Sequence, residues 1–378
     1  MTEPTAPDRN VRYREWRGKW SRRVLDALAA LTPRRRRISP RRRIGMLLTW
    51  GIGDAVMILP FLQALRQAYP EAEITGLGHS WLPDLFADEG LFDSLETLVP
   101  PWTRHSGKYR LWSREWRHFA GQILAYRQKP FDLLASIRPD PRDALLARAL
   151  ACREFAGIAD CGGRAWTSVD LGAGPGDVHR LYGGELSARA AKILCGIDIS
   201  PLPRFRPRDV HRPPAERPLL GISFGASHPI KRWHEAGIAA ALAGVTKAPA
   251  AALVIGHDHS PAVQLPAGWR REDWRGSLTE LKSLLPQIDV LFCSDSGVMH
   301  MAAASGCKVV ALFTTGLMSR FAPPDQRIYA VEPMPCRPCG DSCIHPTLLC
   351  VEGIESLVIS AMLDEALKRN SGRSLPSA

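Results

Sequence analysis

The sequence of 378 residues has no run of 18 or more apolar residues, so it offers no segment expected to cross a membrane as a helix. Hydrophobic residues make up 45% of the chain and charged residues 23%, a balance that excludes a disordered chain. At this length two domains are the expected number.

Two ligand-binding patterns are also missing. No Asp-x-Asp pair occurs, although such paired carboxylates commonly hold a hard cation such as Mg²⁺. The stretch "TWGIGDAVMILP" (49–60) contains Gly51 and Gly53 but lacks the third glycine of the dinucleotide fingerprint. The next apolar run ends at Gly76–Gly78, without the acidic residue of that fingerprint. A nicotinamide or flavin site is therefore not expected, and Gly51 and Gly53 are interpreted as turn glycines.

The positive charge is confined to one end of the chain. Residues 1–43 hold 14 of the 49 Lys and Arg residues and 4 of the 38 Asp and Glu residues, so the rest is nearly neutral. Trp16, Trp20 and Leu28 interleave with arginines at helical spacing, which favours a basic amphipathic helix on an anionic membrane surface. A solvated tail that binds nucleic acid weakly is the alternative. Arginines follow "SRRVL" (21–25) where a cleavage site should lie, so an export signal is not expected.

Four of the nine cysteines cluster with the spacing C-x2-C-x3-C-x6-C. Without an export signal the expected compartment is the reducing cytoplasm, where disulfides are rare. Four thiolates could instead hold a structural zinc or iron, although the spacing matches no common zinc module. The predicted ligands are Cys336, Cys339, Cys343 and Cys350.

Short apolar runs alternate with helical segments in both halves of the chain, which predicts α/β domains with doubly wound parallel sheets. The predicted strands are 44–50, 73–78 and 131–137 in the first half, and 219–223, 251–256, 289–293 and 308–313 in the second. Residues 201–218 contain six prolines and no periodicity, so they are predicted to be a linker. The expected domains are a basic arm (1–43), an amino-terminal domain (44–200), this linker, and a carboxyl-terminal domain (219–378) that ends in an amphipathic helix.

The stretch "CSDSGVMHMAAASG" (293–306) joins the end of a predicted strand to the start of a helix. Free N–H groups and the helix dipole at Ser296 and Gly297 suit a phosphate, and His300 can donate to a phosphate oxygen. An ordinary helix cap by Asp295 or Ser296 with a satisfied histidine is the equally weighted alternative.

Two further strand ends carry polar residues. "GASHPIKRW" (225–233) places Ser227 and Lys231 after the strand 219–223, where a lysine would neutralise a diphosphate. Asp54 opens the helix after Gly53, either as a helix cap or as a general base.

Three segments together resemble glycosyltransferase family 9, the ADP-heptose:lipopolysaccharide heptosyltransferases. They are "GIGDAVMILPFLQALRQAYPEAEI" (51–74), "GASHPIKRW" and "DVLFCSDSGVMHMAAASGCKVVALF" (289–313). The resemblance covers roughly residues 44–365. It implies a GT-B fold, in which two Rossmann-like domains face a cleft, and an inverting reaction without a catalytic metal.

By this resemblance Asp54 matches the aspartate that deprotonates the acceptor, and the donor is ADP-heptose. The donor-binding residues would be Ser227, Lys231, Asp295, Ser296, Gly297 and His300. The segment "TTGLMSRFAPP" (314–324) departs from the family pattern, and Asp258 is only the nearest match to its acidic ribose contact. Another nucleotide sugar therefore stays open as the donor, as does a non-catalytic sugar-nucleotide-binding protein.

The acceptor implied by the resemblance is the lipopolysaccharide core, on the cytoplasmic face of the inner membrane. The segment "RHSGKYRLWSREWRHF" (104–119) could bind the carboxylates and phosphates of this acceptor. A solvated helix face without a ligand is the equally weighted alternative. No nucleic-acid partner is expected. The candidate acceptor-binding residues are Arg104, Lys108, Arg110, Arg114 and Arg117.

Overall fold

The structure is a computed structural model of the whole chain. It describes residues 40–103, 110, 112–159, 164–172, 181–207, 218–225, 229–256, 262–334, 336–337, 343 and 345–368. The chain divides into two compact units between Pro203 and Arg204. Residues 1–39 of the basic arm and residues 208–217 of the expected linker lie outside the described residues.

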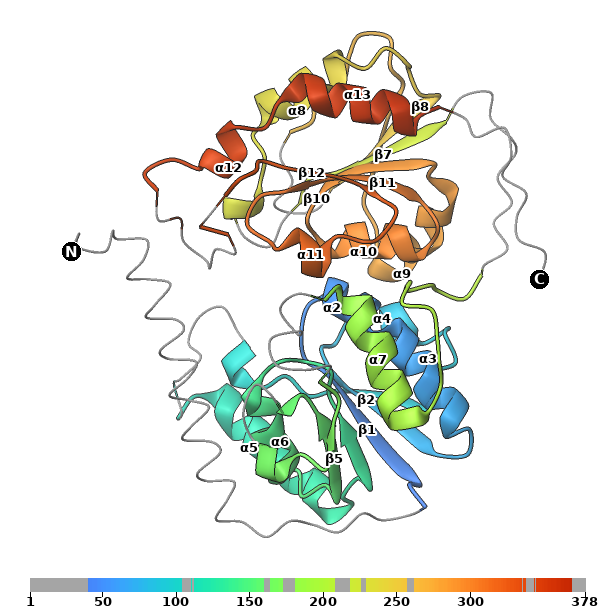
Figure 1. Cartoon of the computed structure of the whole chain (residues 1–378), viewed down its shortest axis with the longest axis vertical. Helices are drawn as coiled ribbons and strands as arrows, with labels where there is room; N and C mark the ends of the chain where they lie inside the picture. Colours follow the sequence, from blue (N-terminus) through green and yellow to red (C-terminus); the bar gives the residue numbers. More distant parts are fainter. Residues whose placement is uncertain are drawn as a thin grey trace. The chain divides into compact units, whose positions relative to one another are not determined.

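Unit 1 is built on a six-stranded sheet in which all neighbouring strands are parallel (Figure 1). Its strand order is β3-β2-β1-β4-β5-β6. The strands are β1 (Arg43–Leu48), β2 (Glu73–Gly78), β3 (Ser94–Thr97), β4 (Leu133–Ala135), β5 (Glu154–Gly157) and β6 (Val169–Asp170).

The helices of unit 1 cover its sheet. The α-helices are α2 (Ile52–Met57), α3 (Leu59–Ala68), α4 (Leu82–Phe86), α5 (Arg114–Gln128), α6 (Pro141–Ala149) and α7 (Gly183–Cys195), with short 3₁₀ turns η1 (Pro101–Thr103) and η3 (Arg164–Trp166). Helices α3 and α7 pack side by side, and the buried hydroxyl of Ser187 accepts a hydrogen bond from Phe61 N–H at 2.9 Å.

Unit 2 repeats the architecture with the order β12-β11-β10-β7-β8-β9, again with parallel neighbours. The strands are β7 (Leu219–Ser223), β8 (Ala251–Ile255), β9 (Arg271–Trp274), β10 (Val290–Ser294), β11 (Lys308–Phe313) and β12 (Arg327–Ala330). The helices are α8 (Glu235–Ala243), α9 (Leu278–Leu284), α10 (Gly297–Ala304), α11 (Met318–Phe321), α12 (Leu349–Glu352) and α13 (Ser356–Ala366), with 3₁₀ turns η5 (Pro229–Lys231) and η6 (Leu285–Gln287).

Apolar side chains explain why the central strands form. In unit 2, Ile222, Phe292 and Val310 from adjacent strands are buried in one hydrophobic cluster, to which α13 adds Ile359 and Leu363. Continuous apolar runs of this kind are typical of parallel strands that are buried on both faces. The predicted α/β class with two doubly wound sheets is confirmed.

Each sheet has one point where the strand order reverses. In unit 1 the chain runs from β1 outwards to β3 and then returns to β4 on the other side of β1. In unit 2 the same reversal lies between β7 and β10. Ligands of open α/β sheets bind outside the carboxyl ends of the strands at such a switch point. The expected ligand sites are therefore at the carboxyl ends of β1 and β4 in unit 1, and of β7 and β10 in unit 2.

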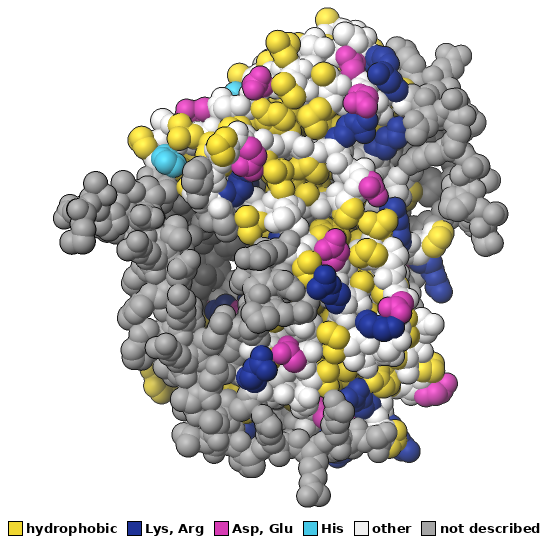
Figure 2. Space-filling model, in the orientation of Figure 1, with side chains coloured by type: hydrophobic (Ala, Val, Ile, Leu, Met, Phe, Trp, Pro, Cys, Tyr) yellow, Lys and Arg dark blue, Asp and Glu magenta, His cyan; other side chains and the backbone are white. Residues whose placement is uncertain are grey.

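The surface of the described residues has mixed charge. Figure 2 shows Lys and Arg side chains interspersed with Asp and Glu side chains on the face in view. This distribution agrees with the near-neutral composition of residues 44–378. None of the helices in the described part of the chain is long and apolar enough to cross a membrane.

Candidate active site

Asp54 lies at the switch point of unit 1. Gly51 is the N-cap of α2, and Asp54 lies in the first turn of that helix, directly after β1. Its Oδ2 lies back over the cap, 3.7 Å from the position that a Cβ on Gly51 would occupy. Gly51 makes no side-chain cap, and Asp54 is half-buried. The carboxylate therefore lies at the edge of the sheet where a ligand is expected.

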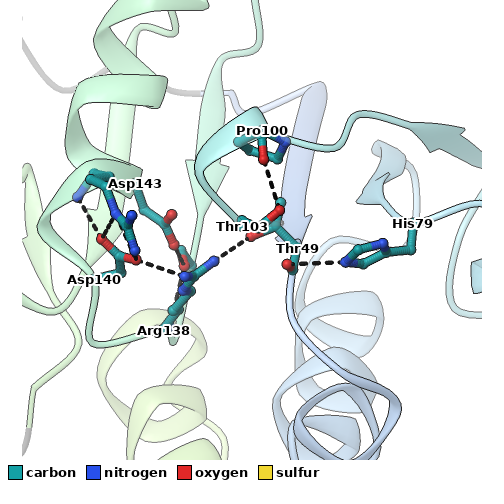
Figure 3. Close-up of polar contacts among 9 residues, drawn as sticks. Thr49, His79, Pro100, Thr103, Arg138, Asp140 and Asp143 are labelled. Atoms are coloured by element: carbon teal, nitrogen blue, oxygen red, sulfur yellow. Dashed lines mark hydrogen bonds and ion pairs between the residues drawn. The ribbon is translucent and has the colours of Figure 1, made fainter. Parts of the chain in front are cut away.

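Arg138 comes from the loop after β4, and its side chain contacts Thr49, which follows β1 (Figure 3). Its guanidinium donates to Thr49 Oγ1 at 2.9 Å and pairs with Asp140 Oδ2 at 2.7 Å. It also lies over the ring of Trp50, 4.1 Å from the centroid, and the side chain is only 12% exposed. Thr49 and Trp50 link β1 to α2, so Arg138 ties the end of β4 to the segment that carries Asp54.

Two more carboxylates surround Arg138. Asp140 caps α6 by accepting from Arg142 N–H at 2.9 Å, and its side chain also pairs with the Arg142 guanidinium at 2.6 Å. Asp143 is fully buried and accepts from Ser136 Oγ at 2.6 Å. Burial raises the pKa of Asp143 to about 7, while the charge of Arg138 acts to lower it. Asp143 therefore titrates near neutral pH.

His79 follows β2 and lies at the same edge of the sheet. His79 Nε2 lies 3.2 Å from the carbonyl oxygen of Thr49. A carbonyl can only accept, so the geometry assigns the proton to Nε2 and leaves Nδ1 as an acceptor. Burial lowers the pKa of His79, and the charge of Arg138 lowers it further. The ring stacks on Trp81 at a centroid distance of 5.5 Å, which fixes its orientation.

At the switch point of unit 2, Lys231 and Asp295 form an ion pair. Lys231 ends η5, which follows β7, and Asp295 follows β10. The Lys231 Nζ lies 2.9 Å from Asp295 Oδ2, and the Asp295 side chain is only 9% exposed. Asp295 N–H also donates to Leu312 O at 3.0 Å, which ties this turn to β11.

The helix after Asp295 begins as the sequence predicts. Ser296 is the N-cap of α10 but makes no side-chain cap, and its buried hydroxyl has no hydrogen-bond partner among the described residues. The same holds, within that part of the chain, for the buried hydroxyls of Ser223 and Ser294 at the ends of β7 and β10. The cap by Ser296, one form of the alternative to a phosphate site, is therefore absent, and its side chain does not occupy the N–H groups at the start of α10, which begins at Gly297.

His300 lies inside α10, where only 5% of its surface is exposed. Burial lowers its pKa to about 4, although the nearby charge of Asp295 acts to raise it. The ring is therefore neutral at pH 7, and its Nδ1 has no hydrogen-bond partner in the described part of the chain. A neutral histidine can still donate one hydrogen bond.

Two residues of the candidate site were not singled out from the sequence. A Cβ on Gly316, in the loop after β11, would lie 2.7 Å from Asp295 Oδ2, so a larger residue here would displace the carboxylate or the loop. The sequence signal that could have indicated Gly316 is the departure of "TTG" (314–316) from the family pattern. Arg138 is the second, and nothing in the local sequence pattern indicated that it contacts Thr49 and Trp50 between β1 and α2.

The expected acceptor segment is described only in part. Arg104, Lys108 and Ser227 lie outside the described residues. Arg110 is exposed, as are Arg114 and Arg117 on α5. Helix α5 is capped by Ser113 and buries Phe119 against Trp102 and Trp116. The charge of Asp54 acts to raise the pKa of Arg138, which burial lowers overall.

Three of the four clustered cysteines are described, and Cys339 is not. Cys350 is buried; burial raises the pKa of its thiol, and Cys336 and Cys343 lie close enough to raise it further. Cys343 Sγ accepts from His345 N–H at 3.4 Å. Within the described ranges no group of three or more His, Cys, Asp or Glu side chains has the geometry of a metal site.

Comparison with known proteins gives a family match over unit 2. Residues 198–345 match the model of glycosyltransferase family 9 (heptosyltransferase). This range contains Lys231, Asp295, Gly297 and His300, but not Asp54. The search of curated proteins found no match.

Solved structures share the fold over most of the chain. Heptosyltransferase II from E. coli is 16% identical with a TM-score of 0.60, covering 86% of this chain and 98% of its own. E. coli heptosyltransferase WaaC with ADP is 13% identical with a TM-score of 0.60, covering 86% and 99%. The dodecameric iron-containing glycosyltransferase TibC of enterotoxigenic E. coli H10407 is 15% identical with a TM-score of 0.52, covering 88% and 77%. The resemblance to glycosyltransferase family 9 that the motifs indicate is therefore confirmed by the family match over residues 198–345, and the solved structures show that the fold is shared over most of the chain.

Proposed function

We propose that this protein is an inverting glycosyltransferase that moves a heptose from ADP-heptose to the lipopolysaccharide core or a related glycan, without a catalytic metal. The main support is that each sheet has polar residues at its switch point and that the two sets differ in chemistry. Unit 1 presents a carboxylate, and unit 2 presents an ammonium group and the start of a helix. A base and an anion site are what transfer from a nucleotide sugar to a hydroxyl requires.

In the proposed reaction Asp54 accepts the proton of the acceptor hydroxyl. The acceptor oxygen then attacks the anomeric carbon of the donor sugar on the face opposite to the diphosphate. A new carbon–oxygen bond forms, the bond from the anomeric carbon to the phosphate oxygen breaks, and ADP leaves with the electron pair. The configuration at the anomeric carbon is therefore inverted.

Unit 2 would stabilise the charge that develops on the diphosphate. Lys231 supplies a positive charge that Asp295 holds at 2.9 Å, and the N–H groups at the start of α10 supply further donors. Neutral His300 donates a hydrogen bond without adding charge. Preorganised donors of this kind can replace a metal ion at a departing phosphate.

The remaining contacts are proposed from the sequence. Arg104, Lys108, Arg110, Arg114 and Arg117 would bind acidic groups of the acceptor, and Ser227 would lie near the donor. The basic arm of residues 1–43 would hold the protein on the cytoplasmic face of the inner membrane, with its tryptophans in the headgroup region. The linker 201–218 would join the acceptor domain to the donor domain.

A structural metal is part of the proposal. The support is the sequence spacing of Cys336, Cys339, Cys343 and Cys350; the three described thiols do not form a metal site by themselves, so Cys339 would have to complete it. TibC, one of the proteins with this fold, contains iron. Zinc or iron bound by the four thiolates would crosslink the segment that precedes α13, and it would take no part in the transfer.

Two alternatives remain: another nucleotide sugar as the donor, and a protein that binds a sugar nucleotide without transferring it. The experiment that separates them combines a thermal-shift screen of ADP-heptose and other sugar nucleotides with an assay of ADP release. A ligand at about 100 times its dissociation constant adds ~2.7 kcal/mol of stability. Stabilisation by ADP-heptose together with ADP release supports the proposal. Stabilisation by a different sugar nucleotide, or binding without release, rejects it.

A further inference from the structure

Arg337 is a nearly buried cation in unit 2, and the proposed reaction gives it no part. It lies in the segment after β12, directly after Cys336, and its side chain is only 5% exposed. Its Nε donates to Thr314 O at 2.9 Å, and Nη2 donates to Val331 O at 3.2 Å. Nη1 donates to a carboxylate oxygen of Glu332. Three acceptors therefore hold the planar guanidinium in one orientation.

Two of these acceptors lie at the ends of neighbouring strands. Phe313 and Ala330, the last residues of β11 and β12, are partners in the parallel register. Thr314 and Val331 are the next residues, so Arg337 bridges the two segments where they leave the sheet. A buried carbonyl group beyond the last pair of a ladder needs another partner, and Thr314 is only 3% exposed. Arg337 is therefore an anchor for the segment that begins at Thr314.

This segment contacts both sides of the ion pair in unit 2. Thr314 Oγ1 makes a long hydrogen bond of 3.5 Å to the carbonyl oxygen of Ile230, the residue before Lys231. At the other end of the segment, a Cβ on Gly316 would lie 2.7 Å from Asp295 Oδ2. Residues 314–316 are therefore in contact with the backbone that carries the ammonium group and with the carboxylate that restrains it.

We propose that Arg337 is a positioning residue for the donor site, because it fixes the loop 314–316 on which the Lys231–Asp295 ion pair rests. This inference rests on the proposed role of that ion pair in donor binding. The fork of Arg337 is engaged with three protein acceptors, so its effect passes through the loop and not through a contact with the donor. Binding groups must be held within about 0.5 Å of their productive positions, which requires supporting contacts of this kind.

Arg271 provides a matched control. It lies on β9, at the edge of the same sheet opposite to β12. Its guanidinium likewise donates to a main-chain carbonyl group, that of Val263, and pairs with a carboxylate, that of Asp273. Arg337→Met and Arg271→Met each remove one charge, one ion pair and a bond to the main chain. Glu332→Gln is a second control, because it removes only the charge of the exposed partner and leaves the two carbonyl groups to Arg337.

The first measurement reports on the loop without any ligand. Amide hydrogen exchange of the full-length protein is followed by mass spectrometry at a temperature well below the melting temperature of every variant. In Arg337→Met the peptide that covers residues 314–318 is expected to lose protection. Arg271→Met and Glu332→Gln are expected to keep the wild-type protection there. Unchanged protection in Arg337→Met, or an equal loss in either control, overturns the inference.

Arg337→Lys is the second variant, for the case that Arg337→Met does not fold. It keeps the positive charge, but one ammonium group cannot reproduce the planar fork that serves the carbonyl groups of Thr314 and Val331. The same loss of protection is expected, and wild-type protection in this variant overturns the inference.

A second measurement separates this inference from the proposed function. ADP is titrated into the same folded variants by calorimetry, and Arg337→Met is expected to raise its dissociation constant about 10-fold, with wild-type affinity in both controls. A role in folding alone would lower the melting temperature and leave the ADP affinity of the folded protein unchanged, and that result overturns the inference. If the wild type binds no ADP, the proposed function fails. The exchange measurement then still decides whether Arg337 fixes the loop.

Discussion

The Lys231 Nζ lies 2.9 Å from Asp295 Oδ2, and this ion pair joins the two strand ends that flank the switch point of unit 2. Asp295 restrains the ammonium group at the start of α10, and Gly316 leaves room for the carboxylate. The ammonium is therefore positioned before a ligand arrives, which reduces the reorganisation that binding requires.

The first prediction concerns this lysine. Lys231→Ala should slow transfer by the equivalent of ~2–4 kcal/mol, because one donor to the departing diphosphate is lost. The change should appear in the rate of ADP release per folded molecule, in addition to the loss of melting temperature that is expected when the nearly buried Asp295 loses this partner. Lys247→Ala is the control, since this lysine lies on the exposed segment after α8. Wild-type turnover in Lys231→Ala would show that Lys231 does not contact the leaving group.

The second prediction tests the close approach at Gly316. The Cβ of Gly316→Ala would lie 2.7 Å from Asp295 Oδ2, so the carboxylate or the loop must move. A displacement of this size is expected to weaken donor binding or turnover by about 10-fold or more. Gly121→Ala on α5 is the matched control, because a Cβ there meets nothing within 4 Å. Equal donor affinity in both variants, measured by titration calorimetry with ADP, would contradict the role of Gly316.

The third prediction follows from the buried Asp143. Its pKa is about 7 in the folded protein and near 4 in the unfolded chain, so the folded state holds the proton more tightly. This contribution to stability is complete below about pH 4 and is lost as the pH rises through about 7. Relative to Asp143→Asn, wild type should therefore lose stability over this window, by up to about 4 kcal/mol.

Urea unfolding of both proteins from pH 4.5 to 8 measures this difference. Asp364→Asn is a control in which the dependence of stability on pH should have the opposite sign. Burial acts to raise the pKa of Asp364, but hydrogen bonds from Thr246 and Lys247 help to lower it overall. Relative to that variant, wild type should lose stability as the pH falls. A constant difference between wild type and Asp143→Asn would show that Asp143 keeps the same ionisation in both states.

Local sequence patterns predict much of this fold but only part of the candidate site. The apolar runs 44–50, 219–223, 289–293 and 308–313 predict β1, β7, β10 and β11, because central parallel strands are apolar along their length. The strands β3, β6, β9 and β12 carry polar residues and have no such run, so they were not predicted. Motif resemblance located Lys231 and Asp295, since their spacing from the strand ends is local.

Arg138 and Gly316 could not be located in that way. Arg138 reaches Thr49 because β4 pairs with β1, and this pairing joins segments almost 90 residues apart in the sequence. The role of Gly316 likewise depends on β11 lying beside β10. Strand order is a property of the whole sheet, and no local periodicity specifies it.

The fourth prediction concerns the clustered cysteines. We expect one zinc or iron per chain when the protein is purified without added metal, as measured by elemental analysis. Cys343→Ser should abolish the bound metal and lower the melting temperature. Cys195→Ser on α7 is the control and should leave the metal content unchanged. Metal-free wild type with Cys336, Cys339, Cys343 and Cys350 all freely titratable would reject the site.

The last prediction tests the proposed base. Asp54 lies in the first turn of α2 and is not its N-cap, so Asp54→Asn removes only the interaction of its charge with the helix N-terminus and should change the melting temperature little. Donor affinity should also be unchanged, because the proposed donor residues belong to unit 2. The amide cannot accept a proton, however, and general-base catalysis is typically worth ~10²–10⁴-fold in rate. Transfer to the acceptor should fall by about that factor. Turnover, ADP affinity and melting temperature measured on one Asp54→Asn preparation distinguish a base from a structural residue. If turnover stays within about threefold of wild type, Asp54 is not the base. His79 would then be tested next, because its Nδ1 is an acceptor at the same edge of the sheet.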